Sequence, residues 1–437
     1  MCAPVRWRGP LLALGGAAAV AGIAVGLSTT GGGDGKMPTT SRNGQASLTI
    51  PSGVGGTTVA KGARTTAGHA LIVGTVDDAF KQADPAAAER LLRVSADAGF
   101  DAALVSSMWT PGHEAPSAPE RLALGNVVKG AERLRMRVFL FVWHGLSGST
   151  PRTPAARRQF AAYTAAIARA FPQIREIVVG NEPNLNTFWM PQFGRGNADL
   201  AATAYLDLLA KTYDALKAVS PRIRVIGGAL APRGSDRPGL KRDTHSPTQF
   251  INDLAAAYRA SGRTMPVMDA FAIHPYMRTS FFPPGESHPS STTITLGDYP
   301  RLTRLLAAAF ARTGQPGRGL PIYYTEFGVQ TKVPREHRHA YTDLKSAAAA
   351  DAVDPDTQAR YYREALSLAS CQPTVAGIFI FHTFDEPDLA GWQSGLYYAD
   401  EKPKPSLAAF RHAASATRLA RLTRCAGGTF VRKGVAP

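Results

Sequence analysis

From about residue 69 onward, short apolar runs alternate with longer amphipathic stretches. The short runs are rich in Val, Ile and Phe, and several are apolar at consecutive positions, as expected of strands that are buried on both faces. There are eight such runs, and we expect strands at Leu71–Val73, Ala102–Val105, Arg137–Trp143, Glu176–Val179, Ile223–Ala229, Met268–His274, Leu320–Thr325 and Gly377–Phe381.

The stretches between these runs are Ala-rich and have helical periodicity, most clearly at 85–98, 154–171, 200–219, 299–313 and 356–370. Proline at a first helical position supports helix starts at Asp84-Pro85, Thr153-Pro154 and Asp354-Pro355. Eight strands that are each followed by a helix predict an α/β fold, a single (β/α)₈ barrel. A doubly wound sheet is the alternative, but the first predicted strand lacks the Gly-rich phosphate loop typical of that fold.

The sequence divides into four predicted segments, of which 69–420 is the barrel. Arg6 and Arg8 precede an uncharged apolar run, so 1–28 is expected to be a signal peptide or an N-terminal membrane anchor, and both readings stay open. Residues 29–68 are rich in Gly, Thr and Ser and predict a flexible linker. Residues 421–437 predict a polar C-terminal tail. This organisation predicts a secreted protein or an extracytoplasmic membrane-anchored one.

The chain is basic, with 49 Lys and Arg against 33 Asp and Glu and a formal net charge of +16. No run of five Lys or Arg, no zinc-finger spacing and no RNA-binding signature occurs, so we expect no nucleic-acid partner. An anionic cell-envelope glycan is one candidate partner for such a surface. The cysteines are Cys2, Cys371 and Cys425, without a CxxC motif, and whether Cys371 and Cys425 pair in an exported protein stays open.

Two glutamates directly follow predicted barrel strands. Glu182 lies in Asn181-Glu182-Pro183 after the fourth strand, and Glu326 lies in Thr325-Glu326-Phe327 at the end of the seventh. The carboxyl ends of barrel strands meet at one mouth, so both side chains are expected to face one cleft. Cleavage of a glycosidic bond with retention needs two carboxyl groups about 5–5.5 Å apart, one as acid/base and one as nucleophile.

These motifs resemble clan A of the glycoside hydrolases, families 5 and 39 especially, over residues 69–420. The resemblance implies that Glu182 is the acid/base, that Glu326 is the nucleophile and that Asn181 contacts the sugar 2-hydroxyl. His274-Pro275-Tyr276 is similar to the His-x-Tyr of family 5, in which the tyrosine hydrogen-bonds the nucleophile and the histidine lines the cleft. His144, after the third strand, corresponds to a further cleft histidine of that family.

Aromatic residues on the predicted mouth loops are candidates for sugar stacking, above all Trp143 and Trp392. Trp109, Trp189, Phe281, Phe282 and Phe384 are further candidates, of which some are expected to be core. The sequence also departs from the family pattern. It lacks the arginine that family 5 has near strand two, and the tip of strand eight has His382 and Phe384 where the clan usually has tryptophan.

The leading hypothesis is a retaining glycosidase that acts on a polysaccharide or oligosaccharide by double displacement. A transglycosidase with the same glutamates and a catalytically weak carbohydrate-binding envelope protein are the alternatives. No metal-ligand motif is apparent in the sequence, so hydrolysis by carboxylates without a metal or another cofactor is expected. The sugar, the linkage and endo or exo action cannot be read from these residues.

Overall fold

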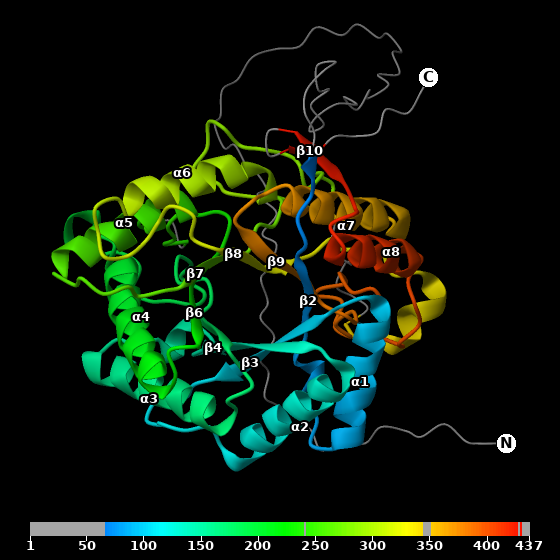
Figure 1. Cartoon of the computed structure of the whole chain (residues 1–437), viewed down its shortest axis with the longest axis horizontal. Helices are drawn as coiled ribbons and strands as arrows, with labels where there is room; N and C mark the ends of the chain where they lie inside the picture. The colour runs from blue at the N-terminus through cyan, green and yellow to red at the C-terminus, as the bar shows by residue number, and fades with distance from the viewer. Residues whose placement is uncertain (1–65, 240–241, 344–350, 427–428, 431–437) are drawn as a thin grey trace, which may run out of the picture.

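A computed structural model describes residues 66–239, 242–343, 351–426 and 429–430 (Figure 1). Strands β2 to β9 form a closed parallel barrel in chain order, which confirms the predicted (β/α)₈ fold. Each of the eight predicted runs overlaps one of these strands. Their bounds are Ile72–Val76 (β2), Ala102–Met108 (β3), Arg137–Trp143 (β4), Glu176–Val179 (β5), Arg224–Leu230 (β6), Ala270–Ile273 (β7), Ile322–Phe327 (β8) and Val375–Phe381 (β9).

An outer ring of helices surrounds the barrel (Figure 1). The expected starts are present: α1, α3 and α7 begin with proline, and the side chains of Asp84, Thr153 and Asp354 accept hydrogen bonds from first-turn N–H groups. The helices are Pro85–Ala98 (α1), Ala118–Leu134 (α2), Pro154–Ala170 (α3), Leu200–Val219 (α4), Pro247–Ala260 (α5), Tyr299–Ala309 (α6), Pro355–Ser370 (α7) and Ser406–Arg418 (α8). Short 3₁₀ turns lie at Asp78–Phe80, Ser147–Ser149, Arg195–Asn197, Leu296–Asp298 and Arg335–Ala340.

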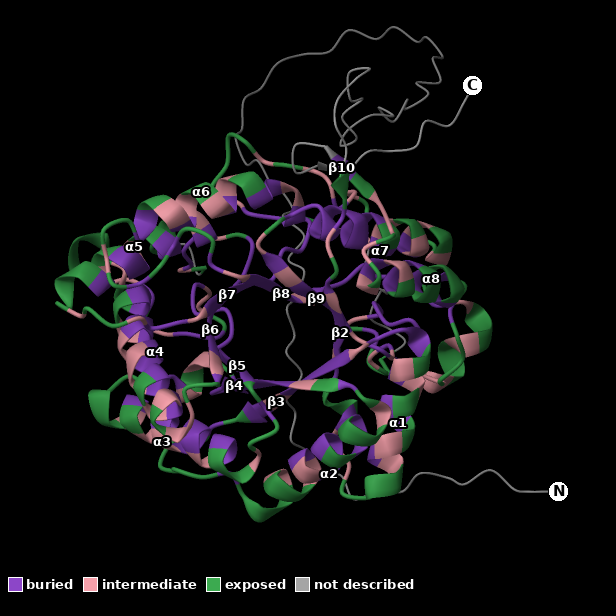
Figure 2. Ribbon diagram, in the orientation of Figure 1, coloured by how far each residue is buried: buried purple, intermediate pink, exposed green. Residues whose placement is uncertain are grey.

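Apolar side chains fill two regions, one between the strands and the helices and one inside the barrel. Figure 2 shows buried residues on the strands and on the inner faces of the helices, with exposed residues outside. The interior is filled by large side chains such as Phe139, Tyr323 and Phe379. A Cβ at Gly74 on β2 would stand 2.2 Å from the Phe379 ring, so the glycine makes room for this ring.

A small antiparallel sheet joins the two ends of the described chain. Strand β1 (Thr66–Ala67) pairs with β10 (Arg424–Ala426), which also pairs with β11 (Thr429–Phe430). A disulfide between Cys371 and Cys425 ties β10 to the end of α7. The predicted signal or anchor segment 1–28 and nearly all of the predicted linker lie outside the described residues.

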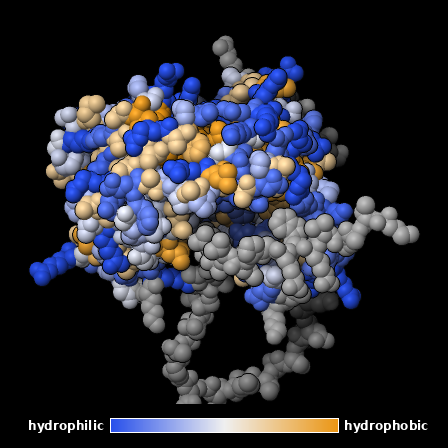
Figure 3. Space-filling view, turned by 90° about the horizontal axis from the view of Figure 1, so that it is seen from below, coloured by the Kyte–Doolittle hydropathy of each residue, from blue (hydrophilic) through white to orange (hydrophobic). Residues whose placement is uncertain are grey.

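On the side of the barrel shown in Figure 3, hydrophilic residues are interspersed with apolar ones, as on ordinary water-exposed protein surfaces. None of the helices in the described part of the chain combines the length and the hydrophobicity that crossing a membrane would require.

A buried ion pair fastens the segment after β9 to the loop after β8. The ammonium of Lys404 donates to Asp385 at 2.7 Å, to Thr331 Oγ1 at 2.7 Å and to the carbonyl of Gln393 at 2.9 Å. Both charged side chains are fully buried. Asp385 also accepts from Tyr341 at 2.8 Å and from the N–H of Gly395 at 2.9 Å. Because the hydrogen-bonding capacity of both ions is used, the pair can hold these loops in one arrangement.

Replacement of Lys404 by methionine is expected to lower the free energy of unfolding by about 3–5 kcal/mol, because it leaves Asp385 buried without its counter-charge. Urea denaturation followed by circular dichroism measures the change. Arg90→Met is the matched control, since Arg90 pairs with Glu401 while each side chain stays about half exposed (49% and 47%), and a loss of at most about 1 kcal/mol is expected there. Equal losses in the two variants would contradict this interpretation.

Candidate active site

The carboxyl ends of the barrel strands surround a cavity of about 280 Å³. Trp143, Asn181 and Glu326 are the predicted site residues that line it. Glu182, His274 and Tyr276 are buried; His274 hydrogen-bonds to Glu182, and Tyr276 donates to Glu326. The other lining residues are Val76, Asp77, Asp78, Ala79, Leu104, Ser106, Phe141, Phe381, His382, Phe384, Asp385, Glu386 and Pro387.

The backbone after β5 turns sharply to present Glu182. Gly180 has a φ of 79°, and a Cβ there would stand 3.0 Å from the Tyr205 ring. Glu182 itself has a φ of 39°, in the left-handed region that residues with a side chain rarely adopt. Its N–H donates to the carbonyl of Ala229 on β6 at 2.9 Å, which helps to hold it there. Such strained conformations cluster at functional sites.

A single histidine nitrogen lies between the two glutamates. His274 Nδ1, directly after β7, is 2.9 Å from Glu182 Oε1 and 3.5 Å from Glu326 Oε2. The distance between Glu182 Oε1 and Glu326 Oε2 therefore cannot exceed the sum of these two contact distances. This bound includes the ~5–5.5 Å separation of retaining glycosidases. Tyr276 donates its hydroxyl to Glu326 Oε2 at 3.2 Å, where the resemblance places it.

Burial raises the pKa of Glu326 above its ordinary value. The charges of His274 and Glu182 act in opposite directions on this pKa, and the hydrogen bond from Tyr276 lowers it without reversing the shift. The cost of burying the charge of Glu326 thus outweighs the contacts that favour its ionised form. Burial also lowers the pKa of His274, yet Glu326 and Glu182 outweigh it, so this pKa is raised.

Several buried polar atoms at the mouth have no partner among the described residues. They include Asn181 Oδ1, Glu182 Oε2, His274 Nε2 and Trp143 Nε1. Buried polar groups are normally satisfied by protein, water or a ligand. A mouth with both donors and acceptors left over suits a ligand with many hydroxyl groups, since a hydroxyl donates and accepts.

The remaining predicted residues occupy different surroundings. Trp392 is half-buried and stacks obliquely on Tyr276, with ring centroids 5.0 Å apart. His144 packs edge-to-face against Trp189, and burial lowers its pKa to about 4, so its ring is neutral at neutral pH. Trp109 and Trp189 are core residues with 1% exposure. The substrate contacts predicted for Asn181, His274, Tyr276, His144, Trp143 and Trp392 stay predictions.

A charged group on the β2 and β9 side of the cavity was not predicted from the sequence. His382 contacts the carbonyl of Val76 at 2.6 Å through Nδ1 and Glu386 Oε1 at 3.1 Å through Nε2. Burial lowers the pKa of His382, but Glu386 and the nearby charge of Asp77 raise it to about 9. A protonated histidine thus lies where the clan usually has tryptophan. The signal that could have located it is Asp77, a carboxylate directly after a barrel strand.

Replacing Tyr276 by phenylalanine is expected to move the acidic limb of the kcat/KM profile to higher pH. The tyrosine hydroxyl lowers the pKa of Glu326, so its loss raises that pKa, and a higher pH is then needed to ionise the carboxylate. A pH–rate profile with an aryl glycoside measures the shift. Tyr361→Phe, on the outer helix α7, is the matched control. An acidic limb that stays in place or moves to lower pH would contradict the assigned contact.

Solved structures share this architecture. The monomeric beta-xylosidase of Caulobacter crescentus is 18% identical, with a TM-score of 0.50 over 80% of this chain and 69% of that one. A GH5_18 protein of Streptomyces cattleya, in complex with Manβ1-4GlcNAc, is 17% identical, with a TM-score of 0.52 over 80% and 81% of the two chains. A glucosidase of Croceicoccus marinus is 12% identical, with a TM-score of 0.53 over 81% and 69%.

The chain has the closed (β/α)₈ barrel fold of these proteins. No protein-family model and no curated protein matches it at the level of sequence. The similarity to these solved structures therefore rests on the closed barrel. At these sequence identities it establishes a common fold only.

Proposed function

We propose that the protein is a retaining glycoside hydrolase that cleaves β-glycosidic bonds by double displacement. The observation that carries this proposal is the contact of Glu182 and Glu326 with the same nitrogen of His274 at the barrel mouth. This arrangement supports a short separation between two carboxyl groups, as retention requires. The presence of carbohydrate-active proteins with the same fold is consistent with it.

In the first step, the Glu326 carboxylate attacks the anomeric carbon. The bond from this carbon to the leaving oxygen breaks, and Glu182 gives its proton to that oxygen. His274 contacts both acids and can redistribute hydrogen bonds as charge moves between them. Glu182 then removes a proton from water, and the resulting hydroxide oxygen displaces Glu326 from the sugar. Both carboxyl groups return to their starting protonation states.

We also propose that the substrate carries negative charge on the leaving-group side. Arg233 and Arg278, in the loops after β6 and β7, are exposed, and Arg233 interacts electrostatically with both Arg278 and Glu182. Since Glu182 protonates the leaving group, cations beside it would lie near the sugar that departs. The net charge of +16 would assist the approach of an anionic glycan.

The double substitution Arg233→Ala/Arg278→Ala is expected to raise KM for an anionic polysaccharide by roughly three- to tenfold, since two exposed charges contribute modestly. Added salt should raise the KM of the wild type in the same direction, because it screens exposed charges. Arg158→Ala/Arg169→Ala, with both arginines exposed on α3, changes net charge equally and serves as the control. Equal effects of the two double variants would contradict a local role.

Turnover of a panel of aryl β-glycosides and polysaccharides by the full chain tests the proposal. Proton NMR of the first-formed product distinguishes retention from inversion, and only retention agrees with the proposed pair. Transfer to an added sugar in preference to water would favour the transglycosidase. Glycan binding without turnover would favour a carbohydrate-binding protein.

We propose that the protein acts outside the cytoplasm, either secreted or anchored by its N-terminus. The disulfide between Cys371 and Cys425 supports this, because such bonds persist mainly in oxidising compartments. Fractionation of cells that produce the full chain, followed by N-terminal sequencing of the protein, distinguishes a cleaved signal peptide from a retained anchor. Recovery of the uncleaved chain in the cytoplasm would contradict export.

A further inference from the structure

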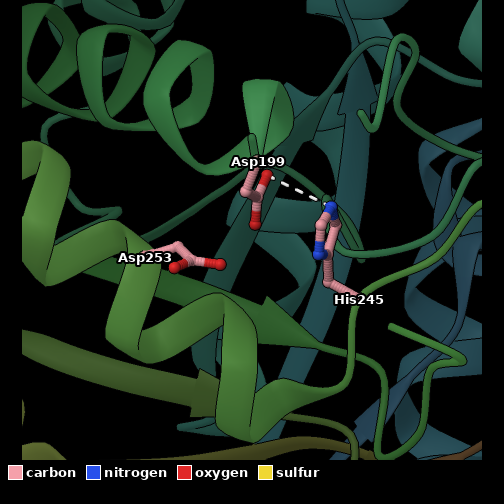
Figure 4. Close-up of side chains that lie close together, drawn as sticks. All are labelled: Asp199, His245 and Asp253. Atoms are coloured by element: carbon pink, nitrogen blue, oxygen red, sulfur yellow. Dashed lines mark ion pairs between the residues drawn. The ribbon is translucent and has the colours of Figure 1, made fainter. Parts of the chain in front are cut away.

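A second polar cluster lies behind the loop that carries Glu182. It consists of Asp199, His245 and Asp253, which come from different elements (Figure 4). Asp199 is the residue before α4, and its Oδ1 accepts from the N–H of Ala202 at 2.7 Å. His245 is in the loop that leads to α5, and Asp253 is on α5 itself. The cluster thus joins the β5–α4 and β6–α5 connections.

Two atoms of this cluster are buried and have no hydrogen-bond partner among the described residues: Asp199 Oδ2 and His245 Nδ1. The side chains that carry them are each only 2% exposed. The other atoms of the same groups are engaged, since His245 Nε2 lies 3.4 Å from Asp199 Oδ1 and 3.3 Å from the carbonyl of Gln192. The unpartnered atoms are therefore the ones left to bind something else.

The third group supplies a further negative charge. Asp253 accepts from the side chain of Gln249 at 2.9 Å and 3.0 Å. Figure 4 shows the carboxylate of Asp253 directed toward the space between Asp199 and His245. One ligand atom from each of the three residues lies within 4.8 Å of the others. Two carboxylates close together repel each other, and a cation between them would remove this repulsion and satisfy both unpartnered atoms.

We propose that Asp199, His245 and Asp253 bind a divalent transition-metal cation, with Zn²⁺ as the preferred ion. Zn²⁺ accepts both imidazole nitrogen and carboxylate oxygen as ligands, with bonds of about 2.0–2.2 Å. Ca²⁺ takes six to eight oxygen ligands and suits a nitrogen-containing set poorly. A half-buried Asp253 leaves one side of the ion open to water as a fourth ligand.

The site is connected with the backbone that presents Glu182. The N–H of His245 donates to the carbonyl of Asn184 at 2.9 Å, and the Asn184 side chain donates back to the carbonyl of His245 at 2.9 Å. Gln192 donates to the carbonyl of Pro183 at 2.9 Å. The ion would therefore join the β5–α4 connection to the β6–α5 connection, which contact residues 183 and 184, respectively. Its role is structural, and it does not depend on the proposed glycosidase activity.

Metal analysis of the untagged full chain, followed by calorimetric titration with ZnCl₂ after dialysis against EDTA, tests the site. We expect one Zn²⁺ per chain, with stronger binding than for Ca²⁺, and a thermal midpoint that rises with Zn²⁺ concentration. Mn²⁺ and Co²⁺ are titrated in parallel. Absence of stoichiometric binding in the wild type would overturn the proposal and would favour a proton shared between the two acids. Tighter binding of Ca²⁺ would overturn the assignment of the ion.

Asp253→Asn and His245→Gln should each weaken Zn²⁺ binding by at least about tenfold. The first removes a charge from a half-buried position and keeps the side-chain shape, so the barrel is expected to remain folded, as circular dichroism can verify. Asp400→Asn is the control, because Asp400 also lies beside histidines, His337 at 2.8 Å and His339 at 4.0 Å, but is far from this site in sequence. If the control loses Zn²⁺ equally, or if both site variants retain it, the ion binds elsewhere and the proposal is wrong.

Discussion

Replacement of Glu326 by alanine is expected to lower kcat by roughly 10⁵-fold, because the variant lacks the carboxylate that we propose attacks the anomeric carbon. The substitution should leave the fold intact, since the Glu326 side chain is 12% exposed at a cavity. It also removes a carboxylate that burial makes costly to ionise. Initial rates on an activated aryl glycoside measure the loss.

Azide distinguishes a missing nucleophile from a disturbed site. A small anion can enter the space left by the Glu326 carboxylate and attack the sugar from the same face, so the variant should form a glycosyl azide of inverted configuration. Glu401→Ala is the matched control, because Glu401 is about half exposed and contacts Arg90 on the outer surface. Activity that survives in Glu326→Ala, or azide product with retained configuration, would refute the assignment of the nucleophile.

Replacement of Glu182 by glutamine is expected to reduce kcat/KM by about 10²–10⁴-fold for substrates whose leaving group must be protonated. Substrates with an acidic leaving group, such as dinitrophenol, depart without that proton and should lose much less. The alkaline limb of the pH profile, which reports loss of the acid's proton, should disappear in the variant. Rates across a series of aryl glycosides with different leaving-group pKa values measure the first effect. The pH–rate profiles of the wild type and the variant measure the second.

Asn184→Asp is the control for a general disturbance of this loop, because Asn184 is also buried there but contacts backbone groups only. It should lower the rates on all substrates in similar proportion. A flat dependence on leaving-group pKa in both wild type and Glu182→Gln would indicate that Glu182 is not the acid.

The barrel was predictable because its strands are local features of the sequence. Ile177–Val179 and similar runs are apolar at every position, which only a strand that is covered on both faces tolerates in a fold of this type. Asp84-Pro85 and Thr153-Pro154 combine an N-cap with a first-position proline, and helices begin there. The position of a glutamate at the end of such a strand then follows from the topology alone.

Properties of the site that depend on residues distant in the sequence could not be predicted. The pKa of Glu326 is raised by its burial in the folded barrel, so no local motif reports it. The pKa of His382 is raised to about 9 by Glu386, which is four residues along the chain, and by Asp77, which only the closed barrel brings near it. Asp199 and His245 are far apart along the chain, and only the fold brings the start of α4 close to the start of α5.

The segment that follows β1 contacts one end of the barrel. His69 donates to the carbonyls of Val375, the first residue of β9, and of Ser370, the last residue of α7. Residues 66–69 therefore lie at the amino-terminal ends of the strands, opposite the barrel mouth that holds Glu182 and Glu326. A load applied to the chain through Thr66 would pull on these ends of the strands and on the disulfide-linked strand β10. Glu182 and Glu326, at the opposite ends of the strands, would stay outside this line of force.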